Sequence, residues 1–376
     1  MKKIIFYTDT PQSGGAELQM FLLAKFLNKD KYKPILVCGN SPELNTWCEK
    51  FQKEDIPVIR IETASKHSTK HYTTLKQIIK EEKPDLLHAH IWNPASCRYA
   101  YLAAKHTHTP MIITEHDPFA LPLLKNLIKK YLIKPLQKII TVSKNNANLL
   151  RKLYPAHSQK IEVIHNGIDT NWWQSQLLRF TEEDRKEIKT QLFHAKENTL
   201  IVTTIAELHE RKGLKYLIQA IPSVVEKYPN TKFVIIGEGK ERANLEKLVS
   251  KLKMEAHVSL IGRQSEIPKL LKASNIFVLP SLREAFGLVN AEAMISPLPV
   301  VASDVGGISE IVKNGETGIL VEPKDSKGLT RGINQLIASP KLREKMAIAG
   351  FERVQKHFSA DAMAKEYEKV YEEIFS

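Results

Sequence analysis

Short apolar runs alternate with amphipathic stretches along the whole chain, and this alternation constrains the fold more than any other feature. Strands that are buried on both faces of a sheet read as continuous apolar runs. The alternation therefore predicts an α/β protein with mainly parallel sheets covered on both faces by helices. The strands expected in the first half are 3–7, 35–38, 58–61, 86–90, 111–114, 139–142 and 162–164, and those in the second half are 200–205, 233–236, 258–261, 276–279, 300–302 and 319–321.

The alternation lapses between residues 166 and 185, where Asn166-Gly167 is a turn signal. A chain of 376 residues is long for one domain and comfortable for two. We therefore predict Rossmann-like domains at 1–170 and 171–355. Residues 359–375 place Met363, Tyr367 and Tyr371 on one face of a helix, which predicts a separate terminal helix within 356–376.

The composition is that of a globular protein, but the charge is unevenly distributed. The net charge is +13, and residues 1–175 carry 25 Lys and Arg against 15 Asp and Glu. A basic half can indicate that the protein binds nucleic acid, anionic lipid or a phosphorylated partner. It can also reflect only a proteome that is rich in lysine. The three cysteines, Cys38, Cys48 and Cys97, suggest neither a disulfide framework nor a zinc site. With no signal peptide and no apolar run near 20 residues, we expect a cytoplasmic protein.

Two carboxylates, Glu284 and Glu292, follow the expected strand 276–279 and lie eight positions apart. In an open α/β sheet, ligands bind at the carboxyl ends of the strands. Eight helical residues turn by two full turns plus about 80°, so the two carboxylates do not share a helix face. We place Glu284 in a loop and Glu292 inside the following helix, whose first N–H groups suit a phosphate or a sugar hydroxyl. The alternative is that Glu284 is an ordinary helix-start carboxylate favoured by the macrodipole.

This segment resembles the E-x7-E signature of glycosyltransferase family 4, the retaining GT-B glycosyl transferases of group 1. The resemblance continues without a gap through 300–311 and 314–321. It implies two Rossmann-like domains that face each other across a cleft, with the C-terminal helix crossing back to the N-terminal domain. It also implies that Glu292 binds the ribose of a nucleotide-sugar, and that the donor sugar is held by Glu284 and the backbone of Ala285, Phe286, Gly287 and Leu288.

The resemblance assigns further donor contacts. Gly14-Gly15, which alone would be a plain tight turn, would face the donor phosphates and sugar. Residues 206–213 resemble the family's G-R-L-x-x-x-K-G loop, in which Lys212 would neutralise the leaving diphosphate. Here Glu207 occupies the position of the family's Arg, which leaves Arg211 as a substitute or as a solvated surface charge. The turns at Gly237 and Arg263 would lie near the base and ribose.

Histidines follow two strands of the first half. Thr114-Glu115-His116-Asp117 resembles the family's T-x-H-D element, whose His reaches the donor sugar, so we predict His116 and Glu284 as the residues at the reaction centre. His88 and His90 lie on one side of a strand and could ligate zinc, but no further ligand follows at metal spacing. We therefore expect no metal site, and we place His90 and Trp92 on the acceptor side.

Residues 121–138 combine leucines with five lysines, at 125, 129, 130, 134 and 138, and contain no acidic residue. This composition fits an interfacial helix on anionic lipid, and equally a packed helix with a solvated lysine face. Because the family often acts on lipid-linked acceptors, we expect contact with the inner face of a membrane.

The sequence thus predicts a retaining, metal-independent glycosyltransferase without a cofactor. It would move a sugar from a nucleotide-sugar donor to a glycan or lipid-linked acceptor, as in cell-surface polysaccharide biosynthesis. The alternatives are a GT-B nucleotide-sugar epimerase or phosphorylase, and a basic nucleic-acid-binding protein. The last would need aromatic residues interleaved with Lys and Arg, and the sequence shows no such array.

Overall fold

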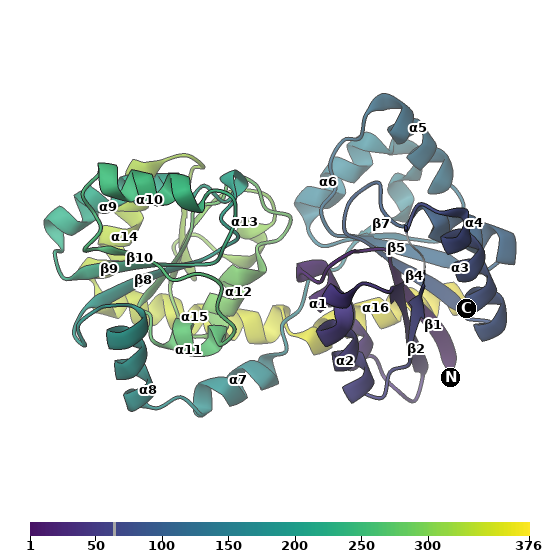
Figure 1. Ribbon diagram of the computed structural model, residues 1–376, viewed down its shortest axis with the longest axis horizontal. Helices are drawn as coiled ribbons and strands as arrows, with labels where there is room; N and C mark the ends of the chain where they lie inside the picture. The colour runs from purple at the N-terminus through teal and green to yellow at the C-terminus, as the bar shows by residue number, and fades with distance from the viewer. Residues whose placement is uncertain (63–64) are drawn as a thin grey trace. The chain divides into compact units, whose positions relative to one another are not determined.

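The computed structural model describes residues 1–62 and 65–376, and the chain divides into two compact units. The first unit comprises Met1–Gly167 together with Ala360–Ser376, and the second comprises Ile168–Ser359. Each unit contains one sheet of parallel strands with helices packed on it (Figure 1). The predicted two-domain α/β architecture is therefore confirmed. The predicted return of the terminal helix to the first unit is confirmed as well.

The sheet of the first unit has the strand order β3-β2-β1-β4-β5-β6-β7. The order reverses between β1 and β4, and such a reversal is where open α/β sheets bind ligands. The strands are β1 (Lys2–Thr8), β2 (Tyr32–Gly39), β3 (Val58–Ile61), β4 (Leu86–Ile91), β5 (Met111–Glu115), β6 (Ile139–Thr141) and β7 (Ile161–Val163).

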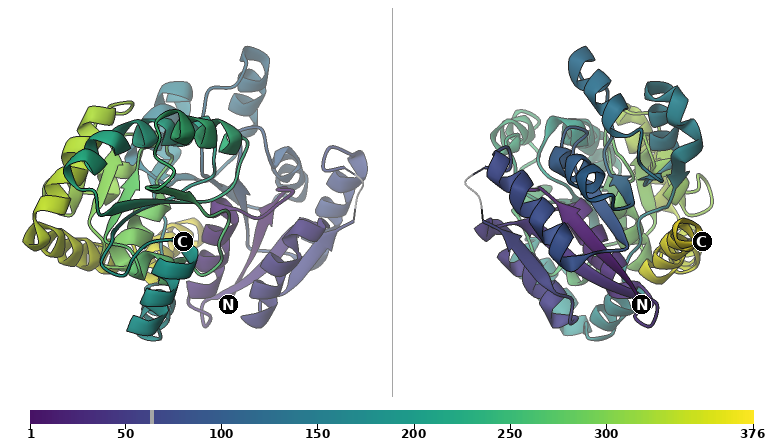
Figure 2. Two further views of the ribbon diagram at one scale, coloured as in Figure 1. Left: turned by 60° about the vertical axis from the view of Figure 1, so that its left-hand side comes forward. Right: turned by 90° about the vertical axis from the view of Figure 1, so that its right-hand side faces the viewer.

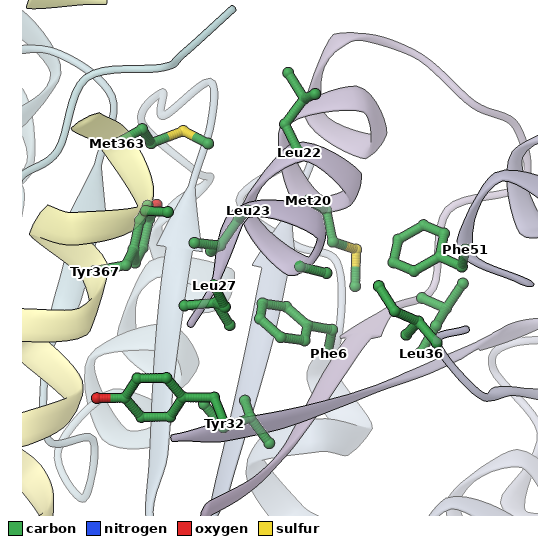
Figure 3. Packing of buried hydrophobic residues seen from close by; sticks show 14 of the residues in the cluster. Phe6, Met20, Leu22, Leu23, Leu27, Tyr32, Leu36, Phe51, Met363 and Tyr367 are labelled. Carbon is green, nitrogen blue, oxygen red and sulfur yellow. The ribbon is translucent and has the colours of Figure 1, made fainter. Parts of the chain in front are cut away.

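Helices cover both faces of this sheet because successive strand residues point to opposite sides. Phe6 faces α1 (Gly15–Phe26), α2 (Asn45–Lys53) and α16 (Ala360–Phe375), as Figure 3 shows for part of this core. Tyr7 faces α3 (Thr69–Glu82), α4 (Arg98–Thr107) and α6 (Lys144–Leu153). In Figure 2 the yellow α16 and the blue α3 and α4 accordingly lie on opposite sides of the purple strands. The remaining helices are α5 (Leu123–Leu132) and the short turns η1 (Pro42–Leu44) and η2 (Pro155–Lys160).

The terminal helix α16 is tied to the sheet by a buried polar network. The Tyr371 hydroxyl bonds Nδ1 of His88 at 2.8 Å, and the Tyr367 hydroxyl bonds Oγ1 of Thr114 at 2.9 Å. Nε2 of His88 completes the network with Thr114 at 2.8 Å. Both ring nitrogens of His88 are thus used within the core, so this histidine holds α16 in place.

The second unit repeats the plan with the strand order β10-β9-β8-β11-β12-β13 and a reversal between β8 and β11. The predicted strands of both units are found. The largest difference between a predicted and an observed strand end is at β2, which begins at Tyr32 and not at residue 35. The strands here are β8 (Leu200–Ile205), β9 (Thr231–Ile236), β10 (Val258–Leu260), β11 (Ile276–Leu279), β12 (Val300–Ser303) and β13 (Gly318–Val321). The helices are α7 (Thr170–Leu178), α8 (Glu182–Glu187), the π-helical η3 (Ile188–Leu192), η4 (Glu210–Lys212), α9 (Leu214–Lys227), α10 (Arg242–Lys251), α11 (Ile267–Lys272), α12 (Leu288–Ile295), α13 (Ile308–Ile311), α14 (Ser326–Ala338) and α15 (Pro340–His357).

None of the helices formed by residues 1–62 and 65–376 is both long enough and apolar enough to cross a bilayer.

Candidate active site

Glu284 lies at the carboxyl end of the second sheet, in the loop between β11 and α12, as predicted. Its Oε1 accepts a hydrogen bond from Nζ of Lys212 at 2.5 Å and another from the Ser281 hydroxyl at 2.8 Å. Only 10% of the Glu284 side chain and 15% of the Lys212 side chain are exposed, so solvent screens the ion pair weakly. The structure therefore brings together the acid and the cation that the sequence places 72 residues apart.

The backbone around Glu284 is held from two sides. The Leu282 N–H donates to the Arg211 carbonyl at 2.7 Å, which joins this loop to the loop of Lys212. Gly306 has a φ of +59°, and a Cβ there would lie 1.7 Å from the Glu284 carbonyl oxygen. Only glycine permits this approach. Phe286 is buried and packs edge-on against Phe358, so its side chain fixes the loop.

Glu292 lies inside α12, as predicted, and Gly287 caps the start of that helix. The Glu292 carboxylate has no hydrogen-bond or ion-pair partner within residues 1–62 and 65–376. Burial raises the pKa of this carboxyl to about 7, because an ion is poorly solvated there. A carboxylate in such a place can accept hydrogen bonds from a ligand that supplies hydroxyl groups.

The other donor residues predicted in the second unit lie near the same sheet edge. Gly237 follows β9 with a φ of +142°, and its Cβ would meet the Ala206 carbonyl oxygen at 1.9 Å. Arg263 is exposed after β10. Nη2 of Arg211 lies 3.4 Å from Oε2 of Glu207. Glu207, which occupies the position of the family's Arg, thus pairs with Arg211, the candidate substitute for that Arg.

In the first unit, His90 and His116 share a hydrogen bond of 3.0 Å between Nδ1 and Nε2, and their rings stack. His116 follows β5, and the His116 N–H donates to the Ile91 carbonyl at 3.0 Å. Burial lowers the pKa of His116 to about 4 and holds the pKa of His90 well below its usual value. Both imidazoles are therefore neutral at pH 7, and one donates to the other.

His90 and Trp92, both predicted to lie on the acceptor side, have different surroundings in the first unit. His90 is 2% exposed and contacts Phe6, His88 and His116, so it supports His116 from within the unit. Trp92 is half-buried, and its Nε1 donates to Oδ1 of Asp9 at 3.0 Å. Nζ of Lys66 lies 4.6 Å from the centroid of the Trp92 ring and 3.7 Å from Asp9.

Gly14 and Gly15 lie where β1 passes into α1, and both are exposed. The Gly14 N–H donates to Oε2 of Glu17 at 2.9 Å, which fixes the start of the helix. Glu17 is buried, and burial raises the pKa of its carboxyl. The loop thus presents backbone at the same sheet edge as Asp9 and His116.

In the lysine-rich stretch 121–138, two of the five lysines form ion pairs with acidic residues from elsewhere in the first unit. No acid occurs in the stretch, but Lys129 is buried and its Nζ lies 2.5 Å from Oε1 of Glu115, on β5. Lys138 pairs with Glu162 and Glu373. Of the five lysines in the stretch 121–138, only Lys125, Lys130 and Lys134 are exposed to solvent. Large apolar side chains are exposed beside them, namely Phe119, Leu123, Leu124, Leu127, Ile128 and Tyr131.

Sequence reasoning missed three residues at these sites: Asp9, Ser281 and Asn290. Asp9 follows β1 directly, and a carboxylate at a strand's carboxyl end is a signal that could have been used. Ser281 and Asn290 carry no such signal, because their roles depend on contacts with the loop backbone and Glu284. Asn290 is fully buried and donates to the Gly287 carbonyl at 3.1 Å.

Within the described parts of the chain, no group of three or more His, Cys, Asp or Glu side chains is arranged to hold a metal ion. His88, His90 and His116 lie close together, but among residues 1–62 and 65–376 these imidazoles are not arranged to hold a metal ion.

Comparisons with known proteins agree with this architecture. Residues 184–353 match the family described as glycosyl transferases group 1, and residues 13–172 match glycosyltransferase family 4. An uncharacterized glycosyltransferase of Methanocaldococcus jannaschii is 30% identical over 97% of this chain and 96% of its own length. A second uncharacterized glycosyltransferase of that organism is 33% identical over 62% of this chain, which spans only 59% of that protein.

A characterized relative and a solved structure add detail. The UDP-Gal:alpha-D-GlcNAc-diphosphoundecaprenol alpha-1,3-galactosyltransferase of Escherichia coli is 25% identical over 86% of this chain and 84% of its own. Anabaena HepE, solved in complex with UDP and glucose, superposes with a TM-score of 0.85 at 21% identity over 99% of this chain and 100% of its own. With the two family matches and a 30% identical relative of nearly full length, this chain belongs to glycosyltransferase family 4, the GT-B glycosyl transferases of group 1.

Proposed function

We propose that this protein is a retaining, metal-independent glycosyltransferase that moves a sugar from a nucleotide-sugar donor to a glycan or lipid-linked acceptor in cell-surface polysaccharide biosynthesis. The observation that carries the proposal is the ion pair between Lys212 and Glu284, which lies in the loop that precedes α12. The donor class is supported by the UDP and glucose bound to Anabaena HepE. The acceptor class is supported by the diphosphoundecaprenol-linked substrate named for the Escherichia coli relative.

The geometry of the second unit suits a departing diphosphate. Lys212 supplies a fixed positive charge, and the N–H groups at the start of α12 add the positive end of a helix dipole. Such preorganised groups stabilise charge as it develops on the leaving oxygen and need no reorganisation at that moment. Glu284, held by Ser281 and Lys212, would accept hydrogen bonds from sugar hydroxyls, and the carboxylate of Glu292 would accept them from the ribose.

His116 of the first unit would act as a neutral hydrogen-bonding group. Its lowered pKa excludes a permanent positive charge at pH 7. A neutral imidazole can donate to a sugar hydroxyl while its other nitrogen bonds His90. Catalysis would then depend on positioning and electrostatic stabilisation.

A nucleotide-sugar screen tests the donor class. We expect one nucleotide-sugar to raise the melting temperature, because a ligand at 100 times its Kd stabilises the native protein by about 2.7 kcal/mol. NMR of the product formed from an α-linked donor should show an α-linked glycoside. A β-linked product would contradict retention, and the lack of a shift with any nucleotide or nucleotide-sugar would contradict the donor class.

Activity should survive chelation, because Lys212 and the helix start would perform the work that a divalent ion does elsewhere. We expect transfer rates with EDTA within twofold of the untreated rate. A metal-dependent glycosyltransferase assayed in parallel provides the control, because it must lose activity under the same conditions. Loss of transfer that magnesium or manganese restores would contradict the metal-independent mechanism.

We also infer that α5 contacts anionic lipid. The helix stands out from its unit in Figures 1 and 2, and the exposed apolar side chains of its first turns lie beside the exposed Lys125 and Lys130. Only Lys129 of this helix is buried. A surface of this kind suits the headgroup region, where apolar side chains enter the lipid and lysines meet anionic headgroups.

Replacing Lys125, Lys130 and Lys134 by Ser should weaken binding to anionic vesicles tenfold or more, because each Lys near such a surface contributes about 1 kcal/mol. Lys129 is left unchanged because it is buried in an ion pair. The matched control replaces Lys50, Lys53 and Lys80, which are exposed on α2 and α3. Co-sedimentation with vesicles measures the effect, and equal loss in both variants would show that only net charge matters.

A further inference from the structure

Two of the three cysteines lie in contact with each other. Cys38 is on β2 and Cys48 is on α2, and their Sγ atoms are 3.7 Å apart. The two residues are joined by a short connection through η1, and both side chains are buried. A disulfide has an S–S length of about 2.05 Å, so a small shift of α2 toward β2 would allow a bond.

The surroundings make the two sulfur atoms unequal. Nη1 of Arg60 lies 3.4 Å from Sγ of Cys48. A hydrogen bond from Cys38 and the charge of Arg60 lower the pKa of Cys48 to about 7, against the opposing effect of burial. The hydrogen bond to Cys48 and burial raise the pKa of Cys38. Cys48, which lies beside the Arg60 cation, is therefore the more readily ionised of the two thiols, and Cys38 can donate its S–H to the Cys48 thiolate.

Cys97 provides an internal comparison. It is buried on the other face of the sheet, and its Sγ lies 3.7 Å from Oδ1 of Asp9. Burial and the Asp9 carboxylate raise the pKa of the Cys97 thiol. The Cys97 sulfur therefore faces a carboxylate, whereas the Cys48 sulfur faces a guanidinium group and a second thiol.

We propose that Cys38 and Cys48 form a reversible oxidation site, a dithiol that hydrogen peroxide converts to an intramolecular disulfide. The Cys48 thiolate attacks one peroxide oxygen, the O–O bond breaks, and the hydroxide that leaves is protonated to water. This step oxidises Cys48 to a sulfenic acid. The sulfur of Cys38 then loses its proton and attacks Sγ of Cys48, and the S–O bond breaks to release a second water. Two thiols are oxidised and one peroxide is reduced to two waters.

The oxidation site contacts the loop that precedes α1. Arg60 also donates to the Gly39 carbonyl at 3.0 Å and to the Ser41 carbonyl at 2.7 Å. The Ser41 hydroxyl donates to the Pro11 carbonyl at 2.8 Å, and Nε1 of Trp47 donates to the Glu17 carbonyl at 2.9 Å. Movement of α2 on oxidation would therefore alter the support of the segment that holds Gly14.

Mass spectrometry of the full-length protein tests the proposal. We expect peroxide treatment under native conditions, followed by alkylation and digestion without reduction, to give a Cys38–Cys48 linked peptide that dithiothreitol separates. Cys97 should remain a thiol that is alkylated only after unfolding, and Cys97→Ala should form the same linked peptide. Hydrogen exchange in residues 11–17 should change on oxidation and return on reduction.

The reaction rate tests the role of Arg60. A rise of one unit in the pKa of Cys48 would leave about one tenth of the thiol ionised at pH 7, so Arg60→Gln should slow oxidation about fivefold. Arg60→Lys, which keeps a positive charge, should slow it less. Failure to form the linked peptide at a peroxide dose that oxidises a free thiol, or oxidation of Cys48 to a sulfinic acid without linkage, would overturn the proposal. Neither result depends on the donor or acceptor, so the transferase assignment is tested separately.

Discussion

Lys129→Met should lower the free energy of unfolding by about 3–5 kcal/mol, which is the usual cost of removing one partner of a buried ion pair. Nζ of Lys129 lies 2.5 Å from Oε1 of Glu115, and the two side chains are 5% and 2% exposed. Without Lys129, the Glu115 carboxylate would remain buried without its cation. Glu115 directly precedes His116, so the loss should also disturb the end of β5.

Urea unfolding at pH 7 measures this effect, and two variants separate its cause. Glu115→Leu combined with Lys129→Met removes both charges and should recover most of the lost stability. Lys130→Met, at the next and exposed position of α5, should change stability by less than about 0.5 kcal/mol. If the double variant is as unstable as Lys129→Met, then packing of the Lys129 stem, and not the unpaired charge, dominates.

The strands could be predicted from the sequence because both sheets are parallel and covered on both faces. A run such as Ile276–Leu279, buried at each position, leaves a signal within a few consecutive residues. The burial of Lys129 could not be predicted from local sequence. Helical periodicity does not distinguish it from the other lysines of a basic stretch, and its partner Glu115 lies on a strand 14 positions earlier.

In the candidate sites, too, local sequence predicts the element on which a residue lies but not the residues that it contacts. The position of Glu284 in a loop and of Glu292 in a helix followed from local pattern. The pairing of Glu284 with Lys212 needed the neighbouring strands β8 and β11, which bring the two loops to one edge. His90 contacts His116 because β4 pairs with β5 in the register His90↔Thr114. Register is a property of the sheet, so the spacing of the histidines could not predict that contact.

Glu292→Gln should weaken the binding of UDP, the nucleotide seen in Anabaena HepE, by 13- to 160-fold. This range corresponds to about 1.5–3 kcal/mol for a hydrogen bond made to a charged group. The reason is that Gln accepts from the ribose hydroxyls more weakly than a carboxylate does. Calorimetry with UDP measures the loss, and Glu344→Gln, at an exposed position of α15, is the control. Unchanged affinity for UDP would remove Glu292 from the nucleotide site.

The same substitution should stabilise the unliganded protein at pH 8, and this opposite sign separates a binding role from a structural one. The pKa of Glu292 is about 7 in the native protein and near 4.5 in the unfolded chain. The stability that the neutral carboxyl contributes is therefore fully present below pH 4.5 and is lost as the pH rises through 7. The loss reaches about 3 kcal/mol at pH 8, since each unit of pKa difference corresponds to 1.36 kcal/mol. Gln never ionises, so Glu292→Gln should unfold at higher urea concentration than the wild type at pH 8 and at the same concentration at pH 4.5.

A variant that binds UDP less tightly and yet is more stable at pH 8 would identify a carboxylate whose burial destabilises the fold and whose charge binds the ligand. A variant that is less stable at both pH values would show instead that Glu292 helps to hold α12 in place.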